Sequence, residues 1–181
     1  LTEIPARAFQ DCKQVLTVAI PKSVTAIGNS AFEGCTSLAR VPLPESVMVV
    51  GDHAFLGCSF LKSIVIPDSV TCIGRGAFQY CSTLKNITIP ESVTAIGVGV
   101  FAGCSSLESI AIPESVTVIG DDAFDNCRSL KSITIPESVT AIGDRAFQYC
   151  SSLTSISIPK SVTAIWDTDI FLGCNSLKIT R

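Results

Sequence analysis

The sequence predicts a solenoid in which short parallel β-strands stack from coil to coil. Phe recurs every 23 residues from Phe9 to Phe147, and Phe171 follows after one extra residue. Cys stands three residues after each of these Phe, and Pro and Gly keep the same interval. Self-similarity at a fixed period of this size is typical of repeat architectures. We therefore expect one solenoid over residues 1–181, with about seven repeats and a partial repeat at each end.

Each repeat is expected to begin with a short β-strand. In residues 130–136, L-K-S-I-T-I-P, apolar and polar residues alternate up to the proline. This period of two is typical of a strand that has one side on a core. Because Pro has no N–H to give to a ladder, the strand ends before it, after about three to five residues.

The rest of the repeat predicts a second extended segment and one tight turn. Residues 137–143, E-S-V-T-A-I-G, alternate again and are rich in β-branched types, which favours a second short strand. Next, Ala146, Phe147 and Cys150 have the spacing of a single helical or 3₁₀ turn that points all three inward. One unit is too small to bury its apolar residues alone, so neighbouring coils must share a core, with strands about 4.8 Å apart.

Three places depart from the repeat. Pro42 adds a proline to the first strand segment of the second repeat, which weakens the ladder there. Val100 takes the place of the usual Ala beside Phe101. In the last repeat Trp166 replaces the Gly and one residue is inserted, so residues 166–181 are expected to form an irregular cap or a truncated repeat.

Composition and charge narrow the function classes. Hydrophobic residues make up 47% of the chain and charged residues 16%, which favours a continuous core over disorder. A net charge of −3 disfavours a nucleic-acid partner. No apolar run approaches the roughly 20 residues of a membrane helix, so no membrane insertion is expected. The chain starts at Leu1 without an apolar leader, and we expect it to be part of a longer protein.

Eight of the nine cysteines occupy one repeat position beside Phe, where small core hydrophobes with free thiols are expected. Parallel stacking keeps their Cβ atoms too far apart for an easy bridge, so no disulfide is expected. A line of sulfurs also does not make a tetrahedral zinc site. Cys72 takes a position that holds Ala or Val elsewhere and is interpreted as a tolerated small residue with partial exposure. The eight are Cys12, Cys35, Cys58, Cys81, Cys104, Cys127, Cys150 and Cys174.

The sequence gives little support for catalysis. His53 is the single histidine and occupies a variable position, and no repeat supplies a distinctive nucleophile beside it. The pairs Asp121–Asp122 and Asp167–Asp169 have too few ligands for a calcium loop, and we interpret them as solvated turns. We expect no catalytic residue, no metal site and no cofactor.

The residues that alternate outward from the first strands form the candidate binding surface, called the inner strand face below. Most side chains on this face are small, and many carry a hydroxyl group. Lysines and one glutamate border it on one side, and the acidic row Glu45, Asp68, Glu91, Glu114 and Glu137 borders it on the other. The alternative is that both charged rows are solvated rims copied with the repeat. The candidate residues are Arg40, Lys62, Ser63, Lys85, Asn86, Thr88, Glu108, Ser109, Lys131, Ser132, Thr134, Ser155 and Ser157.

Two hydroxyl rows repeat more strictly than the charged rims. Ser recurs from Ser23 to Ser161, and Thr stands two residues later in every repeat except at Met48. Backbone hydrogen bonding of the Ser after the Pro-Glu turn is the simpler interpretation, and a lattice that binds ice, mineral or glycan is the alternative. Asn86 begins the sequon Asn-Ile-Thr and is a possible glycosylation site.

The repeat L-x-x-I-x-I-P-x-x-V-x-x-I-G-x-x-A-F-x-x-C resembles the BspA-like, or Treponema-type, class of leucine-rich repeat over nearly the whole chain. The resemblance implies a leucine-rich-repeat solenoid and a role in adhesion to host or matrix, as in surface and secreted proteins of bacteria and parasitic protists. We expect a non-enzymatic module at the cell surface or outside the cell that binds a protein, cell-surface or matrix ligand through the inner strand face. An intracellular or structural spacer is the other interpretation, and the oligomeric state is left open.

Overall fold

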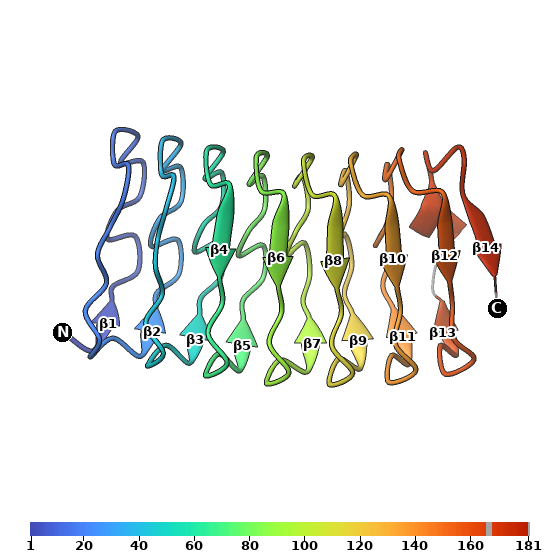
Figure 1. Cartoon of the computed structure of the whole chain (residues 1–181), viewed down its shortest axis with the longest axis horizontal. Coiled ribbons are helices and arrows are strands. Elements are labelled where there is room, and N and C mark those ends of the chain that lie inside the picture. The colour runs from blue at the N-terminus through green and yellow to red at the C-terminus, as the bar shows by residue number, and fades with distance from the viewer. Residues whose placement is uncertain (166–167, 181) are drawn as a thin grey trace.

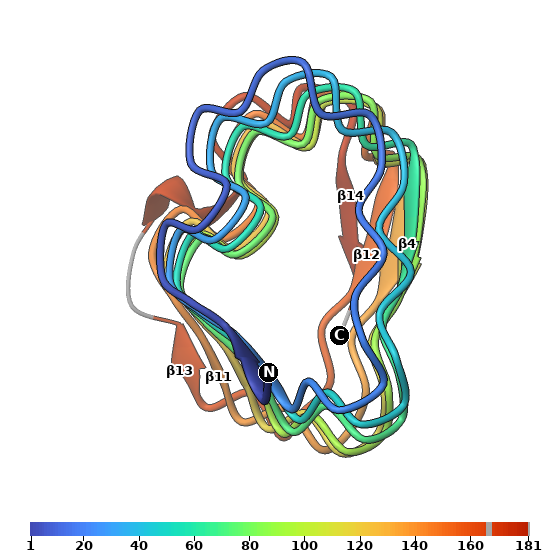
Figure 2. The ribbon, with the colours of Figure 1, turned by 90° about the vertical axis from the view of Figure 1, so that its left-hand side faces the viewer.

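The computed structural model describes residues 1–165 and 168–180, and their coils stack side by side into one elongated solenoid (Figure 1). The two ends of the chain lie at opposite ends of the stack. Seen along the stack, successive coils superimpose closely, with strands on two sides of each coil (Figure 2). The predicted repeat architecture is therefore confirmed. Repeats are named below by their core phenylalanine, from the Phe9 repeat to the Phe171 repeat.

The three-residue strands carry the inner strand face. They occupy the segment that precedes each repeat's proline, and their central residue is buried while the two outer residues are exposed from β4 to β12. All pair in parallel at equivalent repeat positions, so that Ile87 lies opposite both Ile64 and Ile110. These strands are β4 (Ser63–Val65), β6 (Asn86–Thr88), β8 (Ser109–Ala111), β10 (Ser132–Thr134), β12 (Ser155–Ser157) and β14 (Lys178–Thr180).

The two-residue strands lie on the second side of each coil, in the segment that ends at the repeat's glycine. They form two parallel sheets, in the orders β1-β2-β3-β5 and β13-β11-β9-β7. Their brevity follows from the turn on either side of them, since the proline turn precedes each strand and the glycine follows it. They are β1 (Glu3–Ile4), β2 (Ala26–Ile27), β3 (Val49–Val50), β5 (Cys72–Ile73), β7 (Ala95–Ile96), β9 (Val118–Ile119), β11 (Ala141–Ile142) and β13 (Ala164–Ile165).

The first-strand ladder begins late, as the extra proline predicts. In the Phe32 and Phe55 repeats the described residues form no three-residue strand, and a single parallel bridge joins Thr17 to Arg40. Val65 is the last residue of β4, and Pro42 occupies the equivalent position one coil earlier. Pro42 would therefore be the ladder neighbour of Val65. Since Pro lacks the N–H that a ladder needs, regular pairing starts only at β4.

The Phe-x-x-Cys segment is a single hydrogen-bonded turn. The N–H of Cys104 donates to the carbonyl of Phe101 at 3.1 Å, and the same bond recurs in the other repeats. The residue before the Cys has a positive φ, including 58° at Tyr80 and 55° at Tyr149, so the chain reverses instead of continuing as a helix. This confirms the predicted single turn. The four-residue 3₁₀ helix η1 (Thr168–Phe171) is the one helix in the described ranges.

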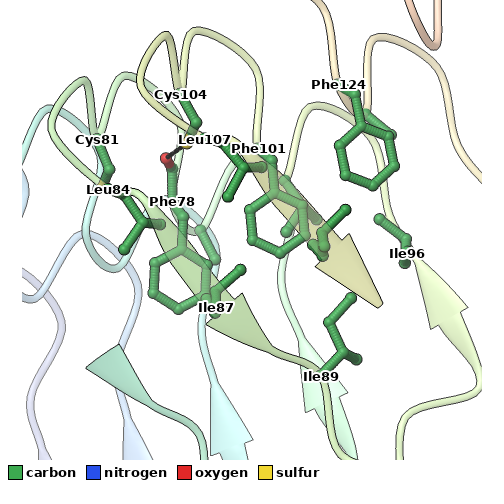
Figure 3. Packing of buried hydrophobic residues seen from close by; sticks show 14 of the residues in the cluster. Phe78, Cys81, Leu84, Ile87, Ile89, Ile96, Phe101, Cys104, Leu107 and Phe124 are labelled. Atoms are coloured by element: carbon green, nitrogen blue, oxygen red, sulfur yellow. Dashed lines mark hydrogen bonds between the residues drawn. The ribbon is translucent and has the colours of Figure 1, made fainter. Parts of the chain in front are cut away.

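The core is one continuous column of stacked side chains. The eight phenylalanines from Phe9 to Phe171 stack ring on ring along the axis, with centroids 5.1 to 5.9 Å apart. Leu84, Ile87 and their equivalents pack beside this column (Figure 3). Among the described residues no polar or charged side chain is buried. Phe78, Phe101 and Phe124 lie in one row, as a shared core requires.

The second-side ladder is interrupted between the Phe78 and Phe101 repeats. The amide of Gly120 donates to the carbonyl of Ile96 at 2.8 Å, whereas no such bond joins Gly97 to Ile73 within the described part of the chain. A Cβ built on Gly97 would lie 3.9 Å from the Ile73 carbonyl oxygen, a looser fit than the 2.9 Å that a Cβ on Gly120 would have from the preceding backbone. Val100 Cγ2 lies 3.7 Å from the same Cβ position, and we infer that its added methyl groups widen the spacing of the two coils at Gly97. This gap is called the Val100 seam below.

The last strand continues the parallel ladder, but its central residue is exposed instead of buried. β14 pairs with β12 in parallel, and all three of its residues are exposed. The predicted replacement at Trp166 lies outside the described residues, as does Asp167, the first residue of the stretch 167–170 that contains the insertion; the rest of that stretch lies in η1.

Candidate functional site

The structure brings the candidate residues together on one side of the solenoid. Twelve of the thirteen are exposed and Glu108 is half-buried. The gap between the β4-β6-β8 and β10-β12-β14 sheets does not divide this face, because the amide of Lys131 still donates to the carbonyl of Glu108 at 3.3 Å. The inner strand face is therefore a continuous surface that spans the coils from Arg40 to Ser157. Asn86 of the sequon is exposed at the start of β6.

The charged row beside this face is not a line of repelling lysines. The carboxylate of Glu108 lies 4.0 Å from Lys85 Nζ and 3.4 Å from Lys131 Nζ, one coil away on either side. The two lysines are largely exposed and Glu108 is half-buried at the surface, so these ion pairs contribute less than about 1 kcal/mol each. These pairs offset part of the repulsion between lysines stacked along the row in the middle of the array.

At the other end of the face the cations have no carboxylate partner. Neither Arg40 nor Lys62 forms an ion pair with a described residue. Lys62 Nζ instead lies 5.2 Å from the ring centre of Phe60, within the range of a cation–π contact. Phe60 is 49% exposed and stands in a column that holds Ser or Thr in most repeats. Sequence reasoning missed it, although its departure from that column was a readable signal.

A groove of about 430 Å³ opens on the inner strand face between the Phe55 and Phe78 repeats. Here the extended segment that contains Pro42 does not pair with β4. We call it the Pro42 groove and define it by six of its lining residues, Arg40, Val41, Pro42, Lys62, Ile64 and Val65.

The serine row has a structural role. The hydroxyls from Ser46 to Ser138 donate to the carbonyl of the valine in the preceding coil, at 2.5 to 2.7 Å. The backbone bonding that the sequence suggested is therefore present, although it runs between coils and not within the turn. The threonines two residues on are exposed, and their hydroxyls also donate to a carbonyl of the preceding coil, at 3.1 to 3.4 Å. Because the protons of both rows are donated to the backbone, a ligand of a two-row binding lattice would meet only hydroxyl lone pairs.

The core cysteines are hydrogen-bond donors as well as packing groups. Cys104 Sγ donates to the carbonyl of Phe78, one repeat earlier, at 3.1 Å (Figure 3). Burial raises the pKa of the Cys35 thiol from 9.0 to about 11 and that of Cys104 to about 12. Burial also raises the pKa of Cys81 and Cys127 well above the ordinary value. These thiols stay protonated and shielded, whereas Cys72 is exposed on β5.

The residues considered for chemistry lie apart from the inner strand face. His53 is half-buried in the turn region and has a positive φ of 55°. Asp122 is bound by Arg145, whose Nε lies 2.8 Å from Asp122 Oδ1. Within the described ranges no group of three or more His, Cys, Asp or Glu side chains is placed to hold a metal ion. Of the second aspartate pair, Asp167 lies outside the described residues.

No helix in the described ranges combines the length and the apolar character that crossing a bilayer requires.

Parallel strands of two or three residues, one phenylalanine column and a 23-residue register define a leucine-rich-repeat solenoid. The model of the BspA type leucine rich repeat region matches residues 2–127 and 94–180, and the chain belongs to this family. A search of curated proteins found no match.

Several solved structures share this fold. A leucine-rich repeat protein from Bacteroides ovatus is 30% identical, with a TM-score of 0.72 over 99% of this chain and 58% of its own. The T. pallidum leucine-rich repeat protein is 34% identical, with a TM-score of 0.78 over 84% of this chain and 72% of its own. A leucine rich cell surface protein from Faecalibacterium prausnitzii is 35% identical, with a TM-score of 0.66 over 86% of this chain and 51% of its own. The chain thus spans little more than half the length of the Bacteroides and Faecalibacterium proteins.

Proposed function

We propose that this chain is a non-enzymatic binding module that recognises a protein, or a ligand on a cell surface or in the matrix, through the inner strand face. The observation that carries the proposal is the continuity of that face: exposed side chains of β4, β6, β8, β10 and β12 form one surface. Leucine-rich-repeat proteins of this family generally bind other proteins and are generally not enzymes. A long, rigid strand surface suits recognition of an extended partner better than a deep pocket does.

A location outside the cell or at its surface is part of this proposal. The Faecalibacterium relative is a cell surface protein, which supports it. The free thiols do not favour the intracellular alternative, because buried thiols of raised pKa supply little thiolate for oxidation in either compartment.

The proposal is tested by blocking the face with bulk and charge. The double substitution Thr134→Arg and Ser157→Arg places two arginines one coil apart on the inner strand face. The matched control, Thr117→Arg and Thr140→Arg, places two arginines one coil apart at exposed positions beside the second-side strands. Fluorescently labelled proteins are compared for binding to cultured host cells and to immobilised matrix proteins. Selective loss of binding in the first variant, with both melting transitions unchanged, is expected. Equal binding by both variants would contradict binding through the inner strand face.

A further inference from the structure

We propose that the Pro42 groove is the anchoring site of the inner strand face, and that its occupant is an extended peptide segment of a partner protein. In this segment an acidic side chain and an apolar one stand two residues apart. The inference rests on the proposed function and deepens it, because it names the part of the face that binds most strongly and the chemistry it selects.

The groove exists because one inter-coil hydrogen bond of the array is missing. The amide of Ala39 donates to the carbonyl of Leu16 at 2.9 Å, and that of Lys85 donates to Lys62 at 3.3 Å. Within the described residues no equivalent bond runs from Lys62 to Ala39. The backbone of this strand segment thus stays unpaired toward β4, and a depression opens between the two coils.

The floor and one wall of the groove are apolar. Val41 and Ile64 form the floor and are 2% and 5% exposed. Val65 stands beside them at 78% exposure, the highest of any exposed large hydrophobic side chain among the described residues. At the same strand position the following repeats carry Thr88, Ala111, Thr134 and Ser157. A partner's apolar side chain would cover Val65 and Pro42 and remove apolar area from water.

The other end of the groove is cationic. Arg40 precedes Pro42 by two residues, and Lys62 precedes Val65 by three. The charged and apolar parts are therefore about 7 to 10 Å apart along the strands. Side chains at positions i and i+2 of an extended peptide point the same way at about 7 Å, so one segment can contact both parts. Because Arg40 and Lys62 lack carboxylate partners in the described structure, an acidic side chain complements them.

Four residues in or beside the groove are also not explained by repetition. Duplication copies a side chain into every coil whether or not it is used. Arg40, Pro42, Phe60 and Val65 each depart from the type that most other repeats hold at that position, and all four fall in two adjacent repeats. Their clustering around one depression points to a single local role.

The test uses the peptide acetyl-Ser-Leu-Ser-Glu-Ser-Leu-Ser-amide, in which either chain direction places Glu and Leu two residues apart. It is titrated into the ¹⁵N-labelled full chain, and amide shifts are followed by NMR. The expected shifts concentrate in residues 39–43 and 62–65 and saturate in the millimolar range. The same peptide with Lys in place of Glu is expected to bind at least fivefold more weakly.

Two double variants change only exposed side chains and thereby keep the fold. Pro42→Thr with Val65→Thr removes the apolar wall, and Arg40→Ser with Lys62→Ser removes the charge; each is expected to weaken binding at least fivefold. Thr117→Val is the matched control, because it exposes a valine beside the second-side strands, away from the inner strand face, and is expected to leave binding unchanged. Wild-type binding by both double variants, equal binding of the Lys peptide, or shifts confined to β10 and β12 would overturn the proposal. If tetragalacturonate shifts the amides of the groove residues and the peptide does not, the peptide proposal is wrong and the ligand of the groove is an acidic glycan.

The outcomes separate this proposal from the proposed function. If Thr134→Arg with Ser157→Arg abolishes binding to cells while both groove variants bind as the wild type does, the inner strand face functions and the groove proposal falls. If the arginine variant binds cells normally while the peptide still occupies the groove, peptide binding in the groove is supported. Recognition of cells through the whole inner strand face is then contradicted.

Discussion

The thiol of Cys104 donates a hydrogen bond to the carbonyl of Phe78, 3.1 Å away in the preceding repeat. That carbonyl also accepts the N–H of Cys81, from its own repeat, at 3.2 Å. The Phe carbonyl thus links the turn of its own coil to the core of the next one. The same pair of bonds recurs with Cys127 and Phe101, so the cysteine row is part of the connection between coils.

Replacing Cys104 by Ala removes the sulfur from a fully buried site and leaves the second lone pair of the Phe78 carbonyl without its donor. We expect a loss of about 1 to 3 kcal/mol in the free energy of unfolding, from the small cavity and the lost hydrogen bond. Urea unfolding followed by circular dichroism measures it. Cys72→Ala is the control, and its exposed site predicts a change within about 0.5 kcal/mol. Equal effects of the two substitutions would contradict a structural role for the row.

Thiol accessibility should divide the cysteines sharply. With a thiol reagent at neutral pH, Cys72 is expected to react quickly in the native protein, and half-buried Cys12 more slowly. The buried thiols are expected to react only after unfolding, because burial raises their pKa and blocks the reagent. Denatured protein should yield all nine thiols. A native count that already approaches nine would show that the core is open.

Stability should fall in alkaline solution. The folded protein keeps its buried thiols protonated, whereas the unfolded chain ionises them above the ordinary pKa of 9.0. The contribution of each thiol is therefore fully present below about pH 9 and is lost as pH rises toward about 11 at Cys35 and about 12 at Cys104. The slope is about 1.4 kcal/mol per pH unit for each such thiol. Urea midpoints between pH 8 and 10.5 measure it, and Cys104→Ala should reduce the slope.

The Val100 seam predicts a local difference in hydrogen exchange. The amide of Gly97 should exchange at least tenfold faster than that of Gly120, since only the latter has a carbonyl partner in the preceding coil. Val100→Ala should slow exchange at Gly97 because it removes the methyl groups that separate the coils. The reciprocal substitution, Ala123→Val, should speed exchange at Gly120. If neither substitution alters these amides, the valine is not the cause of the seam.

Periodicity predicted the fold because each repeat position has one environment. The inward spacing of Phe and Cys and the stop at Pro fix the coil, and the structure has these residues in the positions expected. The αL residue that closes the Phe-x-x-Cys turn was missed, although Gly, Asn or Asp occupies it in most repeats. The link between the Cys104 thiol and the preceding Phe carbonyl could not be predicted, because apolar packing alone also accounts for a buried cysteine.

The inner strand face was predictable as a surface, since alternation determines which side chains point outward. The Pro42 groove was only half predictable. The extra proline indicated a weakened ladder, but the depression depends on the failure of two neighbouring strands to pair. The ion pairs of Glu108 with Lys85 and Lys131 likewise depend on side-chain reach across coils, which residue spacing does not fix.

Each coil of this array meets the next through bonds that join equivalent positions. Inserting or deleting a block of 23 codons within the regular repeats would therefore preserve every type of contact and change only the overall length. Such in-frame changes would shorten or lengthen the distance from the Pro42 groove to the far end of the array, without altering the groove itself. The reach of the molecule and the selectivity of its groove could thus evolve independently.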